Sequence, residues 1–330
     1  MKKVVIIDHV FDNVDIEREI LKDVADYYEY QFTPDREDEV LEAVKDADVV
    51  MATNYDPINR RLIEGMKKAK CIVRHGIGVD SVDLEAATDN GIMVTNVPNY
   101  CLDEVSDHAM ALVLALERKI LMMDKKVRDN PYYKPTDLPQ TRNMRGKQAG
   151  IVGFGRIGRL TGQKLNAFGI NVVYYDPFLT QEAVDGMGMS YAKRVSCEEL
   201  IKTSDYIIVH APLTKENYHF LNRETLALAE KKPYIVNVGR EGHIDIDALV
   251  EAIKAGKVQG AGLDCVDGAP PYNHPGLIAL DEVIITPHAA FYSDDSFKNL
   301  QRIAANQAKQ VLEGKIPDNL VNRDVLNKLR

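Results

Sequence analysis

The sequence predicts an α/β protein built from two doubly wound parallel sheets. Short apolar runs recur along the chain, and most are separated by amphipathic stretches of helical length such as EDEVLEAVKDA and HIDIDALVEAIKAG. This alternation is typical of parallel sheets with covering helices. The apolar runs lie at 4–8, 48–53, 70–76, 92–97, 148–155, 171–176, 205–211, 233–239, 258–264 and 282–288. Ten strands are many for one doubly wound sheet, and 330 residues favour two domains.

Two further segments suggest how the chain passes between these units. The longest helical candidate, 103–129, follows the turn-rich NVPNYC and precedes a loop with three prolines, so it could cross from a first unit to a second. The final helix, SFKNLQRIAANQAKQVLEG, has no following strand of its own, which suggests a return to the first unit. We therefore expect one domain from 1–100 plus 293–330 and another from 101–292.

The composition excludes several classes of protein. With 45% hydrophobic and 28% charged residues, the chain is typical of a globular protein. Its apolar stretches are shorter than the ~20 residues that span a bilayer, and the N-terminal apolar segment is too short for a signal peptide. A net charge of -9 gives no general attraction to nucleic acid or anionic lipid. The four cysteines form no C-x-x-C pair, so we expect reduced thiols in a cytoplasm, and no metal site.

The stretch GIVGFGRIGR suggests a dinucleotide site. Gly153, Gly155 and Gly158 follow an apolar strand and begin a helical stretch, as a tight turn next to a pyrophosphate requires. Asp176 ends the next strand, where an acid would accept hydrogen bonds from an adenosine ribose and repel a 2'-phosphate. This pattern favours NAD over NADP. The alternatives are a structural turn at the glycines and a solvated aspartate before Pro177.

Three further strand ends carry polar residues where open α/β sheets usually bind ligands. These residues are His210 in VHAPLT, Arg240 in VNVGRE and His288 in ITPHAA. A lone arginine is usually a surface charge, and a lone histidine is usually structural. Their joint appearance downstream of a dinucleotide pattern favours a catalytic site.

These motifs together resemble the D-isomer-specific 2-hydroxyacid dehydrogenases over essentially the whole chain. The branch most similar to NVPNYCLDEVSDHAMALVLAL and HAAFYSDDS is that of the C-terminal binding proteins and their bacterial relatives. The resemblance implies a flavodoxin-like substrate domain and a Rossmann NAD-binding domain with a cleft between them. It also implies a homodimer, and reversible hydride transfer between NADH and a 2-oxo acid.

The resemblance also implies roles for single residues. Arg240 would bind the substrate carboxylate through its guanidinium fork, and His288 would exchange a proton with the substrate oxygen. The expected cofactor-binding residues are Gly153, Gly155, Arg156, Ile157, Gly158, Asp176, His210, Pro212, Gly239 and Asp264, the last near the nicotinamide carboxamide. The expected substrate-binding residues besides Arg240 are His75, Gly76, Ile77, Gly78 and Tyr100. Tyr55 and Tyr292 are further cleft candidates, although any of these aromatic side chains could instead be packing.

One position departs from the family pattern. The family places a glutamate five residues after the aspartate that corresponds to Asp264, where it would orient the catalytic histidine and favour its protonated form; here that position is Ala269, followed by the expected Pro270. Asp267 lies two residues too early to replace the lost group. Ala269 could be an engineered substitution, a natural variant in which water or Asp267 substitutes, or a sign of lost catalysis. Glu241, where the family commonly has glycine, is a second departure.

Two functions remain open from the sequence. The first is an NAD-dependent 2-hydroxyacid dehydrogenase, weakened by Ala269, that acts on an unidentified 2-oxo acid. The second is an NAD(H)-responsive, corepressor-like module that binds protein partners with little catalysis. The acidic charge argues against direct DNA binding but not against protein partners.

Overall fold

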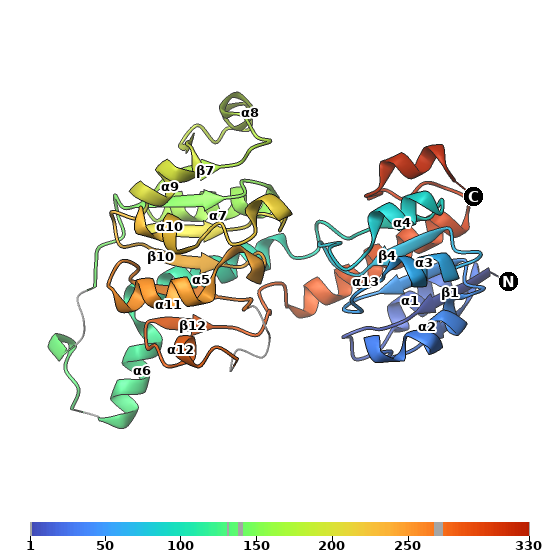
Figure 1. Ribbon diagram of the computed structural model, residues 1–330, viewed down its shortest axis with the longest axis horizontal. Helices are drawn as coiled ribbons and strands as arrows, with labels where there is room; N and C mark the ends of the chain where they lie inside the picture. Colours follow the sequence, from blue (N-terminus) through green and yellow to red (C-terminus); the bar gives the residue numbers. More distant parts are fainter. Residues whose placement is uncertain (1, 131, 138–140, 267–272, 330) are drawn as a thin grey trace. The chain divides into compact units, whose positions relative to one another are not determined.

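The computed structural model describes residues 2–130, 132–137, 141–266 and 273–329. The chain divides into two compact units, the first formed by Met1–Cys101 with Tyr292–Arg330 and the second by Leu102–Phe291 (Figure 1). Within the described residues, no helix is both long enough and apolar enough to cross a membrane.

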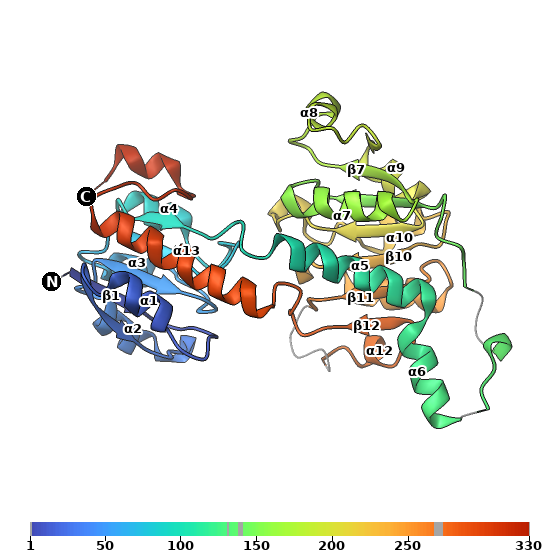
Figure 2. The same ribbon diagram turned by 180° about the vertical axis from the view of Figure 1, so that it is seen from behind.

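The first unit is a five-stranded sheet in the order β2-β1-β3-β4-β5, with every pairing parallel. Its strands are β1 (Lys2–Ile6), β2 (Ala25–Glu29), β3 (Val49–Ala52), β4 (Cys71–Arg74) and β5 (Met93–Thr95). Helices α1 (Asp15–Leu21) and α13 (Asp294–Leu312) cover one face, which Figure 2 shows in front. The other face carries α2 (Glu37–Val44), α3 (Arg60–Gly65) and α4 (Leu84–Asp89), with the short turns η1 (Pro34–Arg36) and η6 (Arg323–Asn327) elsewhere in the unit.

The second unit is a seven-stranded sheet in the order β12-β11-β10-β9-β6-β7-β8, again with every pairing parallel. Its strands are β6 (Gln148–Val152), β7 (Asn171–Tyr175), β8 (Ala192–Arg194), β9 (Tyr206–Val209), β10 (Tyr234–Asn237), β11 (Gly260–Leu263) and β12 (Val283–Ile285). The strand order reverses between β6 and β9, which is where doubly wound sheets bind ligands.

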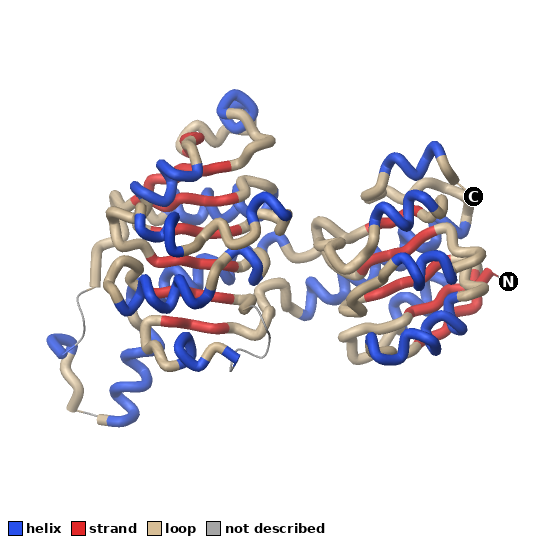
Figure 3. Tube along the Cα trace, viewed as in Figure 1, coloured by secondary structure: helices blue, strands red, loops and turns tan. Residues whose placement is uncertain are grey.

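Helices cover both faces of this second sheet, as Figure 3 shows with helices in blue and strands in red. One face packs on α5 (Leu102–Arg118) and α7 (Arg156–Ala167), the other on α9 (Cys197–Thr203), α10 (Arg223–Ala227) and α11 (Ile246–Lys254). The remaining elements are α6 (Ile120–Asp129), α8 (Gln181–Gly186), α12 (Pro275–Ile278), η2 (Pro135–Asp137), η3 (Lys215–Asn217) and η4 (Glu241–His243). Because both faces are covered, the central strands β9, β10 and β11 are buried along their whole length.

The predicted fold class, two parallel α/β sheets, is confirmed, and each of the ten apolar runs overlaps a strand. The sequence analysis missed β2 and β8. Both are edge strands with mostly exposed side chains, and β8 has three residues, so neither produces an apolar run.

The single helix predicted over 103–129 is wrong. The helix ends at Arg118, and Lys119 adopts a left-handed conformation (φ 53°) before α6 begins at Ile120. The Lys119 side chain is buried and its Nζ donates to the Tyr234 hydroxyl at 3.3 Å. One left-handed residue interrupts the helical hydrogen-bond ladder although the amphipathic pattern continues, which is why the pattern alone did not reveal the break.

Candidate functional site

Six strands of the second unit end in the residues that the sequence singles out. Their carboxyl ends share one edge of the sheet because every strand is parallel. In spatial order along this edge lie Asp176 after β7, Gly153 after β6, His210 after β9, Arg240 after β10, Asp264 after β11 and His288 after β12. Neighbouring strands lie ~4.8 Å apart, so the series from β7 to β12 spans roughly 24 Å.

The glycine turn after β6 leaves open space beside the start of α7. Gly153 has φ +87°, and a Cβ there would lie 2.5 Å from the backbone nitrogen of Ala211. A Cβ on Gly158 would overlap the carbonyl oxygen of Gly153. In contrast, a Cβ on Gly155 would meet no atom of the described chain within 4 Å, although Gly155 is the N-cap of α7. The space over Gly155 therefore adjoins the N-terminal N–H groups of a twelve-residue helix that starts with Arg156 and Ile157.

Asp176 is fixed against this turn. Its Oδ2 accepts a hydrogen bond from the Phe154 backbone N–H at 3.0 Å, and its Oδ1 accepts one from Phe178 at 2.9 Å. The side chain is half-buried. Each carboxylate oxygen can accept a second hydrogen bond, so Asp176 retains capacity for a diol.

His210 is held as a neutral imidazole. Its Nε2 lies 2.9 Å from Oγ1 of Thr161, a fully buried residue on α7. Burial lowers the pKa of His210 to about 3, because desolvation disfavours the charged ring. His210 therefore presents a polar, uncharged side chain beside the glycine turn, next to the exposed Pro212.

The turn that carries Arg240 is closed by a residue that the sequence analysis missed, Asn237. Its buried side-chain amide donates to the Arg240 carbonyl at 2.7 Å and accepts from the Gly239 N–H at 3.0 Å. His243 Nδ1 lies 3.0 Å from the same Arg240 carbonyl. The Arg240 side chain is half-buried, with Nη1 donating to the Gly239 carbonyl at 2.9 Å. An asparagine as the last residue of a buried strand was the sequence signal for this support.

Asp264 holds the loop that carries His288. The carboxylate is 2% exposed and accepts from the Ala289 and Ala290 N–H groups, each at 2.9 Å, and from Thr286 Oγ1 at 2.6 Å. All three donors come from one loop. The sequence analysis assigned Asp264 to the cofactor and did not predict these contacts. The His288 side chain is exposed on this unit, and its ring lies edge-on to Phe291 with centroids 6.2 Å apart.

In the first unit, two carbonyl groups of the glycine loop after β4 accept hydrogen bonds. The Gly76 carbonyl accepts from the Val97 N–H at 2.9 Å, and the Ile77 carbonyl accepts from Asn96 Nδ2 at 2.6 Å. The N–H groups of Ile77 and Gly78 donate to no other residue in the part of the chain that the structure describes. Arg74, which the sequence analysis did not single out, donates to the His75 carbonyl, and its guanidinium occupies the space that a Cβ on Gly76 would need.

The aromatic candidates of the first unit mostly lie in its interior. His75 is 1% exposed, with Nε2 3.3 Å from Oε1 of the fully buried Glu17. Tyr55 and Tyr100 are buried, whereas Tyr292 is 56% exposed and packs edge-on against Phe297. Within the first unit, the side chains of His75, Tyr55 and Tyr100 are therefore packed rather than presented on its surface.

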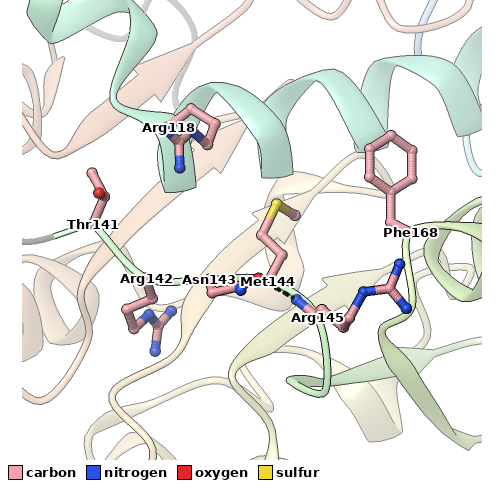
Figure 4. A pocket seen from close by; sticks show the side chains of 7 residues that line it. All are labelled: Arg118, Thr141, Arg142, Asn143, Met144, Arg145 and Phe168. Atoms are coloured by element: carbon pink, nitrogen blue, oxygen red, sulfur yellow. Dashed lines mark hydrogen bonds between the residues drawn. The ribbon is translucent and has the colours of Figure 1, made fainter.

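Three sequence-based predictions lie outside the described residues, those concerning Asp267, Ala269 and Pro270. A hollow of about 540 Å³ opens at the opposite edge of the second sheet, where β6 and β7 begin (Figure 4). It is lined by Arg118, Thr141, Arg142, Asn143, Met144, Arg145 and Phe168. None of the strand-end residues lines this hollow. Among the described residues, no three His, Cys, Asp or Glu side chains are grouped as a metal site would need.

The sequence and the fold of this chain both match known proteins of one family. Residues 110–290 match the family described as D-isomer specific 2-hydroxyacid dehydrogenase, NAD binding domain. A glyoxylate reductase of Thermococcus litoralis is 35% identical over 292 residues, which are 87% of each chain. A D-3-phosphoglycerate dehydrogenase of Methanocaldococcus jannaschii is 38% identical over 86% of this chain, which spans about half (53%) of that longer protein. The structure of a D-lactate dehydrogenase from Aquifex aeolicus, complexed with NAD and lactic acid, superposes with a TM-score of 0.84 at 26% identity and covers 99% of this chain and 98% of that one.

Proposed function

This chain belongs to the D-isomer specific 2-hydroxyacid dehydrogenase family, and we propose that it reversibly reduces a small 2-oxo acid to the D-2-hydroxy acid. Its second unit contains the NAD-binding domain of that family. The observation that carries the proposal is the series of residues along one edge of the second sheet. The open space over Gly155 and the carboxylate of Asp176 lie at the ends of β6 and β7, and an arginine and a histidine lie at the ends of β10 and β12. The assignment to the branch of the C-terminal binding proteins remains a prediction.

The space over Gly155 fits the pyrophosphate of NAD, and Asp176 fits the adenosine ribose. NAD(H), when bound, supplies or accepts the hydride. The carboxylate of Asp176 would repel a 2'-phosphate at that end of the site, which supports a preference for NAD over NADP. His210 adds no charge to the site at neutral pH, since burial lowers its pKa to about 3.

Arg240 is the proposed carboxylate-binding residue. A guanidinium can donate two parallel hydrogen bonds to a carboxylate, which fixes the orientation of a 2-oxo acid as well as its position. The buried Asn237 amide holds the Arg240 backbone, so the guanidinium extends from a fixed turn. Gly76, Ile77 and Gly78 of the first unit keep their sequence-based assignment to the substrate.

His288 is the proposed proton donor during reduction and proton acceptor during oxidation. Its exposure on the second unit leaves the imidazole accessible to a substrate oxygen. The family glutamate that would orient this ring is replaced by Ala269, so we propose a weakened enzyme rather than a fully active one.

A second candidate function is favoured by the same Ala269. An NAD(H)-responsive protein-binding module needs the cofactor site and has no need of a carboxylate beside His288. This candidate predicts tight NADH binding without turnover of any 2-oxo acid.

One pair of variants separates the two functions. We would follow NADH oxidation across glyoxylate, pyruvate, a bulkier 2-oxo acid and a phosphorylated one, each over a full pH range. If the chain is a dehydrogenase, Ala269→Glu should raise kcat by about 10-fold or more, the range typical of a positioned acid–base group or of its support. Ala269→Gln, which matches glutamate in size without its charge, should not. If all three proteins bind NADH and none reduces any acid, the dehydrogenase proposal is rejected and the binding module is retained.

We also propose a homodimer in the cytoplasm. The observation that supports association is α6, which buries none of its side chains against the described chain and exposes Ile120, Leu121 and Val127 by 49–55%. An apolar helix face of this kind is typical of an interface. Light scattering of the purified chain would measure its mass, and a monomer at micromolar concentration would reject this part of the proposal.

A further inference from the structure

The loop that carries His288 has a strained backbone. His288 itself adopts a left-handed conformation (φ 53°), and its N–H donates to the Thr286 carbonyl at 3.0 Å. A residue with a side chain is held in this conformation by its surroundings, and such residues cluster at functional sites. The contacts that hold the loop therefore also determine where the imidazole lies.

Most of these contacts converge on one carboxylate. Oδ1 of Asp264 accepts from the Ala289 N–H and from Thr286 Oγ1, and Oδ2 accepts from the Ala290 N–H. The loop is thus tied to the end of β11 on both sides of His288. Because Asp264 is 2% exposed, water cannot readily replace a lost donor.

The Thr286 hydroxyl extends this network to α5. It donates its single proton to Asp264 at 2.6 Å, so its oxygen is left to accept from Nε2 of His108 at 3.0 Å. His108 must then carry a proton on Nε2. The direct distance from this Nε2 to Asp264 Oδ1 is 3.6 Å, too long for a hydrogen bond, so the hydroxyl of Thr286 is the link.

We propose that His108 is a positioning residue which, through Thr286 and Asp264, fixes the loop that presents His288. The inference rests on the proposed role of His288 in proton transfer. The direction of the relay is set by its donors: His108 donates to Thr286, Thr286 donates to Asp264, and Asp264 accepts the backbone N–H groups of the loop. The side chain of His108 is 24% exposed and projects from α5, a helix that packs against β10, β11 and β12. The relay therefore connects the loop that carries His288 to a helix packed on the sheet.

Two matched pairs of variants test this relay. His108→Leu removes the donor and keeps an apolar side chain of similar size, whereas His108→Gln retains an N–H donor at similar reach. Thr286→Val removes the hydroxyl isosterically, whereas Thr286→Ser keeps it. Each variant is compared with its parent chain in the Ala269→Glu background, where turnover is expected to be highest.

Two readouts are needed. The first is kcat and KM for the best 2-oxo acid, with the Kd for NADH. We expect kcat to fall about 10- to 100-fold in His108→Leu and Thr286→Val, with KM and Kd changed by less than threefold, and to recover largely in His108→Gln and Thr286→Ser. The second readout is amide hydrogen exchange of peptides that contain Ala289 and Ala290, which requires no substrate. We expect faster exchange there in the first variant of each pair.

The outcomes distinguish failure of the relay from failure of the proposed function. If exchange accelerates as expected while no form turns over any acid, the relay stands and the dehydrogenase assignment fails. If His108→Leu and Thr286→Val leave exchange at Ala289 and Ala290 unchanged, the relay is rejected. A uniform loss of thermal stability that His108→Gln does not rescue would show that His108 is a packing residue, and this would also reject the relay.

Discussion

Adding one methyl group to Gly155 should separate cofactor binding from folding. Its backbone is extended (φ -66°), a conformation open to alanine, and a Cβ there meets no described atom within 4 Å. The cost of alanine at an N-cap and the gain from a less flexible unfolded chain are each about 1 kcal/mol or less, with opposite signs. Gly155→Ala should therefore change the free energy of unfolding by less than about 1 kcal/mol. If the pyrophosphate lies over Gly155, the methyl group should weaken NADH binding by at least ~10-fold, or about 1.4 kcal/mol.

The matched control is Gly158→Ala, three residues along the same turn. Its new Cβ would overlap the backbone carbonyl of Gly153, which cannot move without distorting the strand-to-helix turn. Overpacking of this kind costs about 1–3 kcal/mol, so this variant should be visibly less stable in urea denaturation. NADH fluorescence titration gives the Kd of both proteins. An unchanged Kd in Gly155→Ala would refute the proposed position of the pyrophosphate, and a Gly158→Ala protein as stable as its parent would refute the packing argument.

Three further predictions concern other residues of the two units. Arg240→Lys keeps the charge but loses the guanidinium fork, so kcat/KM for the best 2-oxo acid should fall ~100-fold while the Kd for NADH stays within threefold; equal activity would reject bidentate carboxylate binding. The pKa of His210 falls from 6.5 to about 3 on folding, so between these values the unfolded chain binds a proton that the folded chain does not. The free energy of unfolding should therefore fall as the pH drops, by about 2 kcal/mol between pH 6.5 and pH 5. His210→Gln should remove that part of the pH dependence, measured by urea denaturation. Glu17→Ala removes a fully buried carboxylate that accepts from Gln301 Nε2 at 2.9 Å and lies 3.3 Å from the His75 ring, and it should destabilise the chain by about 3 kcal/mol, measured in the same way, whereas an unchanged midpoint would mean that the carboxylate contributes nothing.

The sequence predicted the class of fold because central parallel strands are apolar on both faces and stand out between amphipathic helices. The runs that became β9, β10 and β11 are buried along their whole length. Edge strands lack this signal, and so β2 and β8 were missed. The break at Lys119 was hidden for a different reason, since one left-handed residue leaves the apolar period of the flanking helices nearly intact.

For the site, the sequence identified residues by the strand ends they follow, and the parallel topology brings those ends to one edge. What it could not supply is which groups each residue contacts. Asp264 is a case in point, because its position in the chain gives no indication that all three of its donors come from a loop more than 20 residues later. His108 lies within the helix predicted over 103–129, but its bond to Thr286 depends on how α5 packs across the sheet. Asn237 stands out in the sequence only as a polar residue at the end of a buried strand, and its hydrogen bonds to the Arg240 turn could not be predicted from that position.

These contacts bear on how much the replacement by Ala269 should matter. A carboxylate next to a catalytic histidine can act on the charge of the ring and on its orientation. In this chain the Thr286 hydroxyl before His288 and the Ala289 and Ala290 N–H groups after it already donate to Asp264, and Thr286 is also bonded to His108. We therefore expect the position of the loop not to require a carboxylate at residue 269. What the missing carboxylate would still supply is the rotation of the ring and the stabilisation of its protonated form, which are needed for proton transfer but not for binding. It follows that Ala269 should lower kcat far more than it raises KM, and that Arg240 and the cofactor turn should work normally in the same chain.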